Sequence, residues 1–210
     1  MSNLFSMKRT KDTYNYNIFI RSILAGICIA LGGAIFIKIG GVVGSVMFAF
    51  GLLSVVHFKL PLYTGTAGFI ELNKIKEYKK IILILLGNIL GCILLSIIVY
   101  NSYNINSLDA TSIIQSRLDT GYLQSFLNAI GCGLIMTLIV KGGRDRNQLL
   151  ILFGIPLFIL LGFYHSIADA FYMMCVEEQL RNDFILTYLI IVLGNFIGCN
   201  IPRLLKLSYT

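Results

Sequence analysis

The segment GFYHSIADAFY (residues 162–172) places two ionisable side chains in one of the most apolar parts of the chain. His165 and Asp169 are four residues apart, so on a helix they lie on one face, a turn from each other. A histidine can donate, accept or carry a proton near neutral pH. Ionisable groups in hydrocarbon are costly and rare, and they mark ion or proton pathways. We therefore take His165 as a candidate transport residue, whereas Asp169 is equally suited to capping a helix N-terminus.

The elements around these two residues are apolar along most of the chain. Of 210 residues, 57% are hydrophobic and only 13% are charged, and the mean hydropathy is +0.82. This composition excludes an ordinary soluble domain and is typical of membrane-spanning helices. The sequence predicts six spans, at about 18–37, 41–58, 81–100, 123–140, 149–174 and 184–202. We expect a channel domain at 18–205, with halves at about 18–100 and 123–205, between cytoplasmic tails at 1–17 and 206–210.

The net charge of +7 is distributed as a membrane topology requires, rather than as a nucleic-acid surface. Loops rich in Lys and Arg stay in the cytoplasm. Most of the 17 basic residues fall on one side of the six predicted spans: Lys8, Arg9, Lys11, Arg21, Lys74, Lys76, Lys79, Lys80, Lys141, Arg144, Arg146, Arg203 and Lys206. We therefore expect a multi-pass protein of the cell membrane with both termini in the cytoplasm. The five cysteines show no C-x-x-C spacing, so we expect them to be packing residues, with no metal and no cofactor.

A repeat divides the chain into two halves of three spans. GNILGC (87–92) recurs as GNFIGC (194–199) after 107 residues, and RSILAG (21–26) is echoed by QSFLNA (124–129) after 103 residues. Because three is odd, the two halves must cross the membrane in opposite directions, as in transporters built from inverted repeats. Close helix packing alone can also produce recurring glycines. The matched positions within the spans favour a true inverted 3+3 repeat.

Spans two and five are each predicted to be broken. LPLYTGTAG (60–68) contains Pro61 and Gly65, whereas YHSIADAFY (164–172) is rich in small and polar residues. A break at membrane depth is tolerated where the freed backbone faces protein or a water-lined cavity. Each break exposes N–H groups at the positive end of a helix dipole, which a threonine of the first string or Asp169 could cap. Two such ends near mid-membrane would make a site for a small anion.

These strings resemble the motifs of the formate–nitrite transporter family. AGICIALGG (25–33) is similar to its first-span glycine motif, and LYTG (62–65) to its second-span L-F-T-G break. GNILGC and LGNFIGC are similar to its third and sixth spans. The most specific string, GFYHSIADAFYM (162–173), resembles the family's G-F-x-H-S-x-A-N-M-F. The resemblance runs in order through all six spans.

The resemblance implies a homopentamer in which each subunit is folded like an aquaporin and has its own pore for small monovalent anions. Formate, nitrite, hydrosulfide and short carboxylates such as lactate are the substrates of such families, with protons and the lipid bilayer as further partners. The central histidine of the family falls on His165 and its partner threonine on Thr64. The other positions carried over are two apolar constrictions and an outer basic residue: Leu62, Tyr63, Phe48, Leu52, Phe158 and Arg117. Asn88 and Asn195, in the repeated strings, are expected to brace the pore helices by hydrogen bonds.

Three residues depart from the family's pattern. Asp169 stands where the family has asparagine after H-S-x-A, Gly133 replaces the asparagine that follows the fourth-span Cys132, and Pro61 replaces an acid before L-F-T-G. A fixed negative charge would repel an anion, so Asp169 must be paired with His165, protonated, or turned away from the pore as a cap.

The sequence therefore predicts a non-enzymatic channel or transporter for small monovalent anions or their weak acids. The central histidine would protonate the substrate or assist it electrostatically. An aquaporin-like pore for neutral solutes is an alternative, although the N-P-A strings of aquaporins are absent. A membrane-embedded enzyme using His165 and Asp169 is a second alternative, although no nucleophile or metal motif accompanies them. A subunit or sensor that has lost transport is a third.

Overall fold

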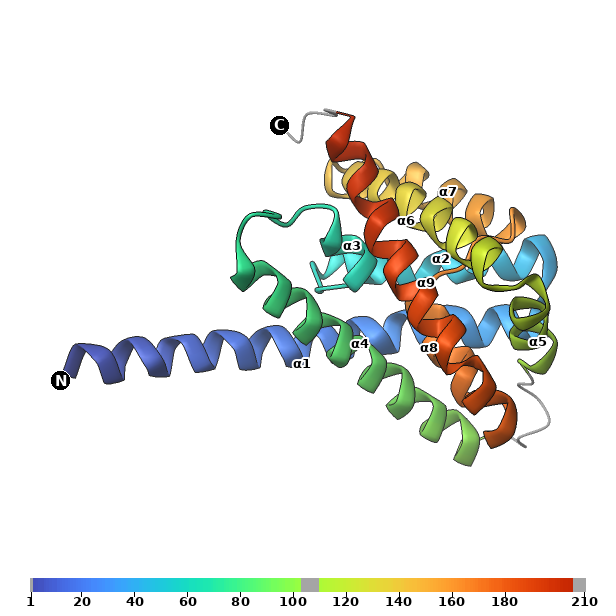
Figure 1. The fold of residues 1–210 in the computed structure, drawn as a ribbon, viewed down its shortest axis with the longest axis horizontal. Coiled ribbons are helices and arrows are strands. Elements are labelled where there is room, and N and C mark those ends of the chain that lie inside the picture. Colours follow the sequence, from blue (N-terminus) through green and yellow to red (C-terminus); the bar gives the residue numbers. More distant parts are fainter. Residues whose placement is uncertain (1, 103–109, 206–210) are drawn as a thin grey trace.

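The computed structural model describes residues 2–102 and 110–205, and all regular elements within these ranges are helices (Figure 1). In chain order they are α1 (Ser2–Ile39), α2 (Gly41–His57), α3 (Tyr63–Ala67), α4 (Ile75–Ser102), α5 (Thr111–Thr120), α6 (Tyr122–Arg144), α7 (Gln148–Leu160), α8 (Ser166–Met174) and α9 (Glu178–Leu204).

The long helices coincide with four of the six predicted spans. Four stretches are long and apolar enough to cross a membrane: Tyr14–Ile39, Ile75–Val99, Tyr122–Arg144 and Glu178–Leu204. The two remaining spans are occupied by the shorter apolar helices α2 and α7, which are followed by the short helices α3 and α8. Both interruptions that the sequence indicates are therefore present in the fold.

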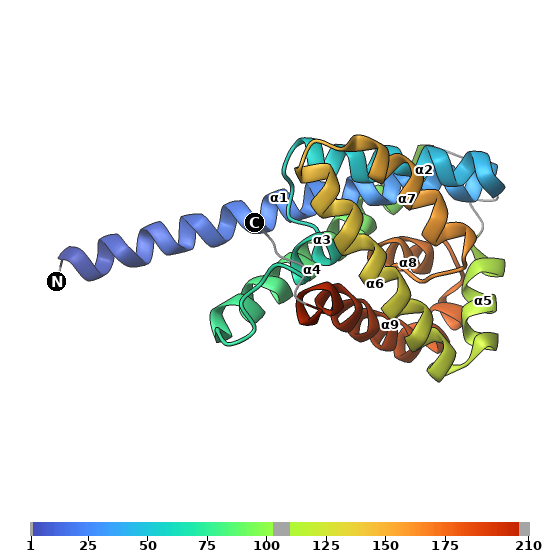
Figure 2. The same ribbon diagram turned by 90° about the horizontal axis from the view of Figure 1, so that it is seen from above.

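Two further segments differ from a simple reading of the sequence. Residues 2–17, expected to form a tail, are helical and belong to α1, whose first turns extend away from the other helices (Figures 1 and 2). The link between the third and fourth predicted spans, for which the sequence indicated no helix, contains helix α5. The expected tail at 206–210 lies outside the described residues.

The first interruption follows His57, where α2 ends. Lys59 has a left-handed backbone (φ 52°), and Pro61 follows in the gap, where its missing N–H is no loss. The carbonyls of Phe58 and Lys59 both accept hydrogen bonds from Arg21 of α1, at 3.0 and 2.9 Å. Gly65, predicted to help break this helix, instead lies inside α3. Pro61 and the turn before it therefore make the break without Gly65.

The second interruption is made by Gly162, directly after α7. Its φ of 72° is a conformation that glycine adopts at no steric cost. The chain then runs in an extended conformation to His165, and α8 begins at Ser166. A non-helical stretch thus separates each apolar helix from the short helix after it.

Glycine allows the long helices to cross almost backbone to backbone. A Cβ added to Gly91 of α4 would lie 2.1 Å from the carbonyl oxygen of Ile23, and one added to Gly198 of α9 would lie 2.1 Å from that of Ile130. A Cβ on Gly26 would likewise meet Asn88 O at 2.0 Å. Contacts closer than about 3 Å are repulsive, so no larger residue fits without a backbone shift.

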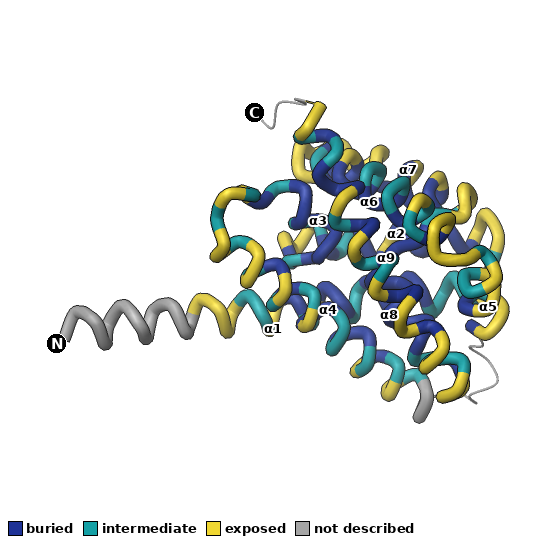
Figure 3. Tube along the Cα trace, in the orientation of Figure 1, coloured by how far each residue is buried: buried dark blue, intermediate teal, exposed yellow. Residues whose placement is uncertain are grey.

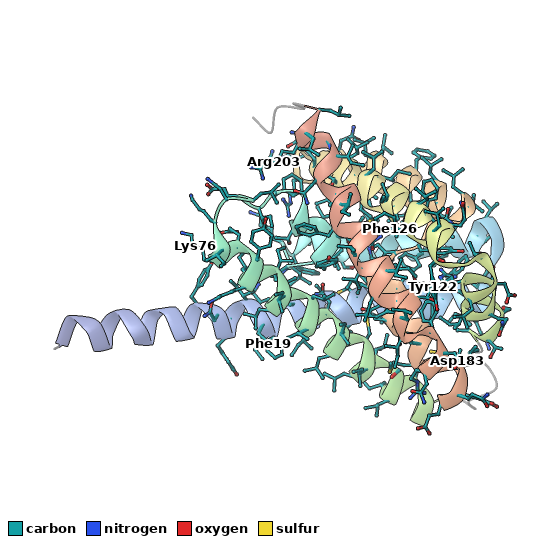
Figure 4. The ribbon with its side chains drawn as sticks, viewed as in Figure 1. Phe19, Lys76, Tyr122, Phe126, Asp183 and Arg203 are labelled. Carbon is teal, nitrogen blue, oxygen red and sulfur yellow. The ribbon has the colours of Figure 1, made fainter. Side chains whose placement is uncertain are left out.

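The contacts of α1 with α4 recur between α6 and α9 after 107 residues. Gly87 faces Phe19 O and Gly194 faces Phe126 O, the two phenylalanines labelled in Figure 4. The sequence match of RSILAG with QSFLNA pairs Ser22 with Ser125, 103 residues later. In the structure this match is wrong by one helical turn. Ala129, not Ser125, occupies the position that corresponds to Ser22.

The short helices α3 and α8 lie inside the ring of longer ones, where the chain is most buried (Figure 3). Helix α3 contacts α4, α6 and α9, and α8 contacts α1, α4, α5 and α9. The outward faces carry large exposed apolar side chains, such as Val42, Phe153 and Leu189. A buried polar centre inside an apolar exterior is the arrangement of a protein whose solvent is lipid.

Candidate functional site

Two residues from the two interruptions meet at the centre of the molecule. Thr64 lies in the first turn of α3, and His165 is the residue before α8. Thr64 Oγ1 and His165 Nε2 are 2.9 Å apart, and both side chains are buried. The hydrogen bond therefore joins the starts of the two short helices.

The other ring nitrogen identifies the tautomer of the neutral imidazole. The N–H of Ala168 donates to His165 Nδ1 over 3.2 Å, so Nδ1 carries a lone pair and the ring proton is on Nε2. Nε2–H then donates to Thr64 Oγ1, whose own hydrogen is left to donate elsewhere. Both the histidine and the threonine are thus oriented by the fold.

The helix caps differ from the prediction. His165 itself caps α8, through Nδ1, whereas Asp169 lies inside the first turn and its own N–H bonds to the carbonyl of His165. The corresponding residue before α3 is Leu62, with nearly the same extended backbone (φ −109°, ψ 136°) but no side-chain cap. Neither Asp169 nor a threonine caps these helices by a side-chain hydrogen bond.

Asn88 anchors the first interruption. Its Oδ1 accepts the N–H of Tyr63 at 2.8 Å, and its Nδ2 donates to Ser22 O at 2.8 Å and to Pro61 O at 3.1 Å. The side chain is fully buried. One amide therefore pairs two backbone groups at the α3 end of the gap and ties them to α1.

Asn195 makes the same three bonds at the second interruption. Its Oδ1 accepts the N–H of Ser166, and its Nδ2 donates to Ala129 O and Tyr164 O, all at 2.8 Å. A buried side chain at each gap thus satisfies backbone groups that the missing helix turn leaves free.

Two cysteines contribute in a way that sequence reasoning missed. The thiols of Cys92 and Cys199 lie 3.3 and 3.2 Å from the carbonyl oxygens of Ile167 and Thr64, respectively. Each is a weak donor into one of the short helices. Their place in the repeated strings GNILGC and GNFIGC was the signal available in the sequence. All five cysteines are free.

A cavity of about 340 Å³ reaches His165 from the α5 side. Its walls include Phe48, Phe158, Arg117, Tyr164 and Tyr172, and the exposed residues Ser112 and Ser116 line its outer part. Phe158 stands between Phe48 and His165, with ring centroids 6.4 and 5.9 Å away. An aromatic pair therefore lies at the cavity end nearest the imidazole.

Three further residues from the sequence prediction are buried but do not line this cavity. Leu52 lies in α2, Leu62 directly before α3, and Tyr63 in its first turn. Tyr63 also donates its hydroxyl to Val192 O at 3.0 Å.

Asp169 pairs with Arg117, and not with His165 as one of the expectations had it. Arg117 Nε lies 2.8 Å from Asp169 Oδ1, and the carboxylate is completely buried. Arg117 Nη1 donates to Ile113 O at 3.0 Å. The guanidinium also stacks over Tyr164, 4.5 Å from the ring centroid. The sequence placed Arg117 at the outer mouth, through the family resemblance; in the fold, α5 brings this cation against Asp169 of α8.

On the α3 side of the molecule, away from α5, two arginines donate hydrogen bonds to backbone carbonyls in and after α3. Arg144 donates to Gly65 O at 2.8 Å and stacks over Phe69. Arg203 donates to Ile70 O. Helix α8 has a counterpart in Arg181, which donates to Met173 O and Val176 O, both at 2.9 Å. Cations at the C-terminal side of both short helices complement their dipoles.

The profile of the family described as "Formate/nitrite transporter" matches residues 6–205. The chain belongs to this family. No curated protein sequence matches it. Among solved structures, it is similar to a "Pentameric formate channel with formate bound" (TM-score 0.80, 20% identity, 93% of this chain and 99% of that one). It is also similar to an "FNT family ion channel" (TM-score 0.76, 16% identity, 95% and 92%).

As a formate/nitrite transporter family member, the chain is an integral membrane protein of a channel and transporter family. The structure shows what surrounds each of the three residues that depart from the family's pattern. Asp169 has an arginine partner, and Pro61 supplies a carbonyl to Asn88. Gly133 lies where a Cβ would be 2.3 Å from Asn195 O, so this helix crossing excludes the family's asparagine.

A metal centre has no support in the part of the chain that the structure describes. No group of three or more His, Cys, Asp and Glu side chains there is arranged to hold an ion. The second histidine, His57, is exposed at the end of α2 and takes no part in the site.

Proposed function

We propose that this protein is a transmembrane channel for small monovalent anions or their weak acids, of the formate, nitrite, hydrosulfide and short-carboxylate class. One observation carries the proposal: a buried histidine joins the starts of two short helices at the inner end of a cavity. An ionisable residue in such a place belongs to a permeation path.

We further propose that six spans form an inverted 3+3 repeat with an aquaporin-like arrangement. Three contacts at fixed offsets support it: the hydrogen bonds of Asn88 and Asn195, the thiols of Cys92 and Cys199, and the glycine crossings. By this repeat Leu62 corresponds to His165. Likewise Thr64 corresponds to Ile167, so each half would contribute one member of the central Thr64–His165 pair.

Passage begins at the α5 side, where Arg117 attracts an anion into the cavity. The aromatic pair of Phe48 and Phe158 forms the outer constriction, and Leu62, Tyr63 and Leu52 form the inner one. A bare charge loses its hydration in such a constriction, which costs several kcal/mol unless a donor replaces the water. The site between the constrictions must therefore supply hydrogen bonds.

We propose that His165 and Thr64 supply them, by electrostatic assistance rather than by donating a proton. The neutral ring carries its proton on Nε2, and loss of that proton to a substrate would leave an imidazolate anion in an apolar site. A cationic ring would need a proton at Nδ1, where it would displace the N–H of Ala168. The Nε2–H and Thr64 hydroxyl can polarise toward the substrate without either cost. A proton taken up from the aqueous side completes passage as the weak acid.

We place the protein in the cytoplasmic membrane with both termini in the cytoplasm. Lys76 and Arg203 lie at the end opposite Tyr122 and Asp183 (Figure 4), which fits the positive-inside rule. The cavity then opens outward. The five-fold assembly of the similar formate channel suggests a homopentamer for this chain as well.

The test is stopped-flow uptake of formate, nitrite, hydrosulfide, acetate and lactate into proteoliposomes at two pH values. We expect uptake of at least one anion above that of empty liposomes, and an uptake lower by about tenfold or more in His165→Phe. A loss of one hydrogen bond to a charged group, about 1.5–3 kcal/mol, corresponds to that factor.

His57→Phe is the matched control and should transport as the wild type does. Equal uptake by His165→Phe with the same pH response would contradict the proposed mechanism. Swelling of the proteoliposomes in glycerol, without anion uptake, would instead identify a pore for neutral solutes.

A further inference from the structure

Asp169 and Arg117 form a buried ion pair beside the cavity, one helical turn from His165. The carboxylate has no exposed surface, and the arginine side chain is 13% exposed. Arg117, Tyr172 and His165 all line the cavity. The pair therefore lies on the route that an anion takes to the imidazole, and its net charge acts on that anion.

The guanidinium is fixed by more than the carboxylate. Nη1 is held by Ile113 O, and the plane stacks over Tyr164, with the Tyr172 ring 5.7 Å away. Asparagine has nearly the size of aspartate, and the carbonyl of Ile113 and the ring of Tyr164 would still hold the guanidinium. Replacement of Asp169 by asparagine would thus keep Arg117 in position and remove only the negative charge.

Charge compensation sets the strength of an anion site at this arginine. An isolated buried cation beside an apolar cavity attracts an anion strongly, because little solvent screens the field. A carboxylate at 2.8 Å cancels most of that field. A channel needs attraction that is strong enough for entry and weak enough for release.

We propose that Asp169 is a positioning and compensating residue that converts Arg117 into a weak, quickly exchanging site for a small carboxylate or nitrite before the histidine. This inference rests on the proposed function. It assigns the negative charge of Asp169 a role in that function. Arg117 lines the cavity, and a guanidinium offers a planar fork of N–H donors that suits a two-oxygen anion.

The experiment compares formate uptake in Asp169→Asn, Arg117→Gln and the double variant, with half-saturation concentration and maximal rate measured separately. In Asp169→Asn we expect the half-saturation concentration to fall by about tenfold and the maximal rate to fall with it, as charge coupling of close pairs allows. A merely structural role would lower the rate without tightening binding. Asp119→Asn, an exposed acid on α5, is the matched control and should leave both values unchanged.

Arg117→Gln leaves the carboxylate uncompensated, so the half-saturation concentration should rise by about tenfold. The double variant should recover most of this loss, because the repelling charge is gone as well. Arg117→Lys keeps the positive charge, so its half-saturation concentration should lie closer to that of the wild type than the value of Arg117→Gln does. This variant replaces Arg117→Gln in the comparison if Arg117→Gln does not fold. An unchanged or raised half-saturation concentration in Asp169→Asn would overturn the inference, as would a double variant no better than Arg117→Gln.

Binding to the purified protein separates the two proposals. Formate should raise the melting temperature of detergent-solubilised Asp169→Asn at lower concentration than it does for the wild type. If wild-type proteoliposomes conduct but Asp169→Asn binds no more tightly, only this inference fails. If no anion is taken up by the wild type, the proposed function fails, and the binding shift still tests the pair.

Discussion

His165 is held from both ring nitrogens, by the N–H of Ala168 and by Thr64 Oγ1. A ring restrained in this way keeps one tautomer and one orientation, which the proposed role of His165 as a donor to an anion requires. In the proposed mechanism the threonine matters as much as the histidine, because its hydroxyl would pass the polarisation of Nε2–H on to a substrate.

Thr64→Val tests this role at nearly constant volume. We expect formate uptake to fall by about tenfold, because the loss of one hydrogen bond to a charged group costs about that factor. Proteoliposome uptake measures the effect. Thr137→Val is the matched control, since Thr137 is also buried but bonds only to Cys199 O. Equal losses in the two variants would show that Thr64 has no special part in transport.

At the scale of elements, each interruption depends on a single asparagine on a neighbouring long helix. Asn88 and Asn195 together satisfy six backbone groups, two at each gap and one each on α1 and α6. Unpaired backbone groups at membrane depth are costly, so the gap and its asparagine are one structural unit.

Asn195→Ala should destabilise the protein by about 3 kcal/mol, because three buried backbone groups lose their partner. The melting temperature in detergent should fall by about 5–10 °C for a chain of this size. Asn128→Ala, also on a long helix, removes only a side-chain bond to Gln124 and should change the melting temperature little. An Asn195→Ala protein as stable as this control would contradict the anchoring role.

Gly133→Ala tests the crossing of α6 and α9. The added Cβ would lie 2.3 Å from Asn195 O, and overpacking of this kind costs about 1–3 kcal/mol. Gly65→Ala is the control for stability, because its Cβ would meet nothing nearer than 3.5 Å. We expect thermal unfolding to separate the two variants clearly. Similar melting temperatures of the two variants would contradict the prediction, because they would mean that α6 and α9 move apart to admit the Cβ at little cost.

On the scale of the whole molecule, the apolar exterior must be covered by lipid or by other copies of the chain. Exposed residues such as Val43, Phe50 and Leu157 lie on α2 and α7. The proposed homopentamer would bury part of this surface while each subunit keeps its own cavity.

Native mass spectrometry in detergent tests the assembly directly. We expect a species of five times the 23.4 kDa protomer. A dominant monomer or trimer under conditions that preserve anion uptake would exclude the pentamer as the transporting form.

Much of this fold follows from local signals in the sequence. Apolar runs give the long helices, Pro61 and Gly162 give the two gaps, and the repeated Gly-Asn strings mark the residues that anchor them. These signals act within a few residues, through hydropathy, fixed dihedrals and helix breaking, so one chain reveals them. The candidate histidine was identifiable for the same reason, since an ionisable group in hydrocarbon stands out.

Tertiary structure alone decided which groups meet. The partner of Asp169 is Arg117, on an amphipathic helix that no hydropathy pattern ties to α8. The cap of α8 is the histidine and not the aspartate, and α1 corresponds to α6 after 107 residues instead of the 103 of the sequence echo. Such pairings depend on how the helices cross. A shift of one helix by one turn along its neighbour leaves the hydropathy pattern of the sequence unchanged, although it changes every side-chain contact between the two helices.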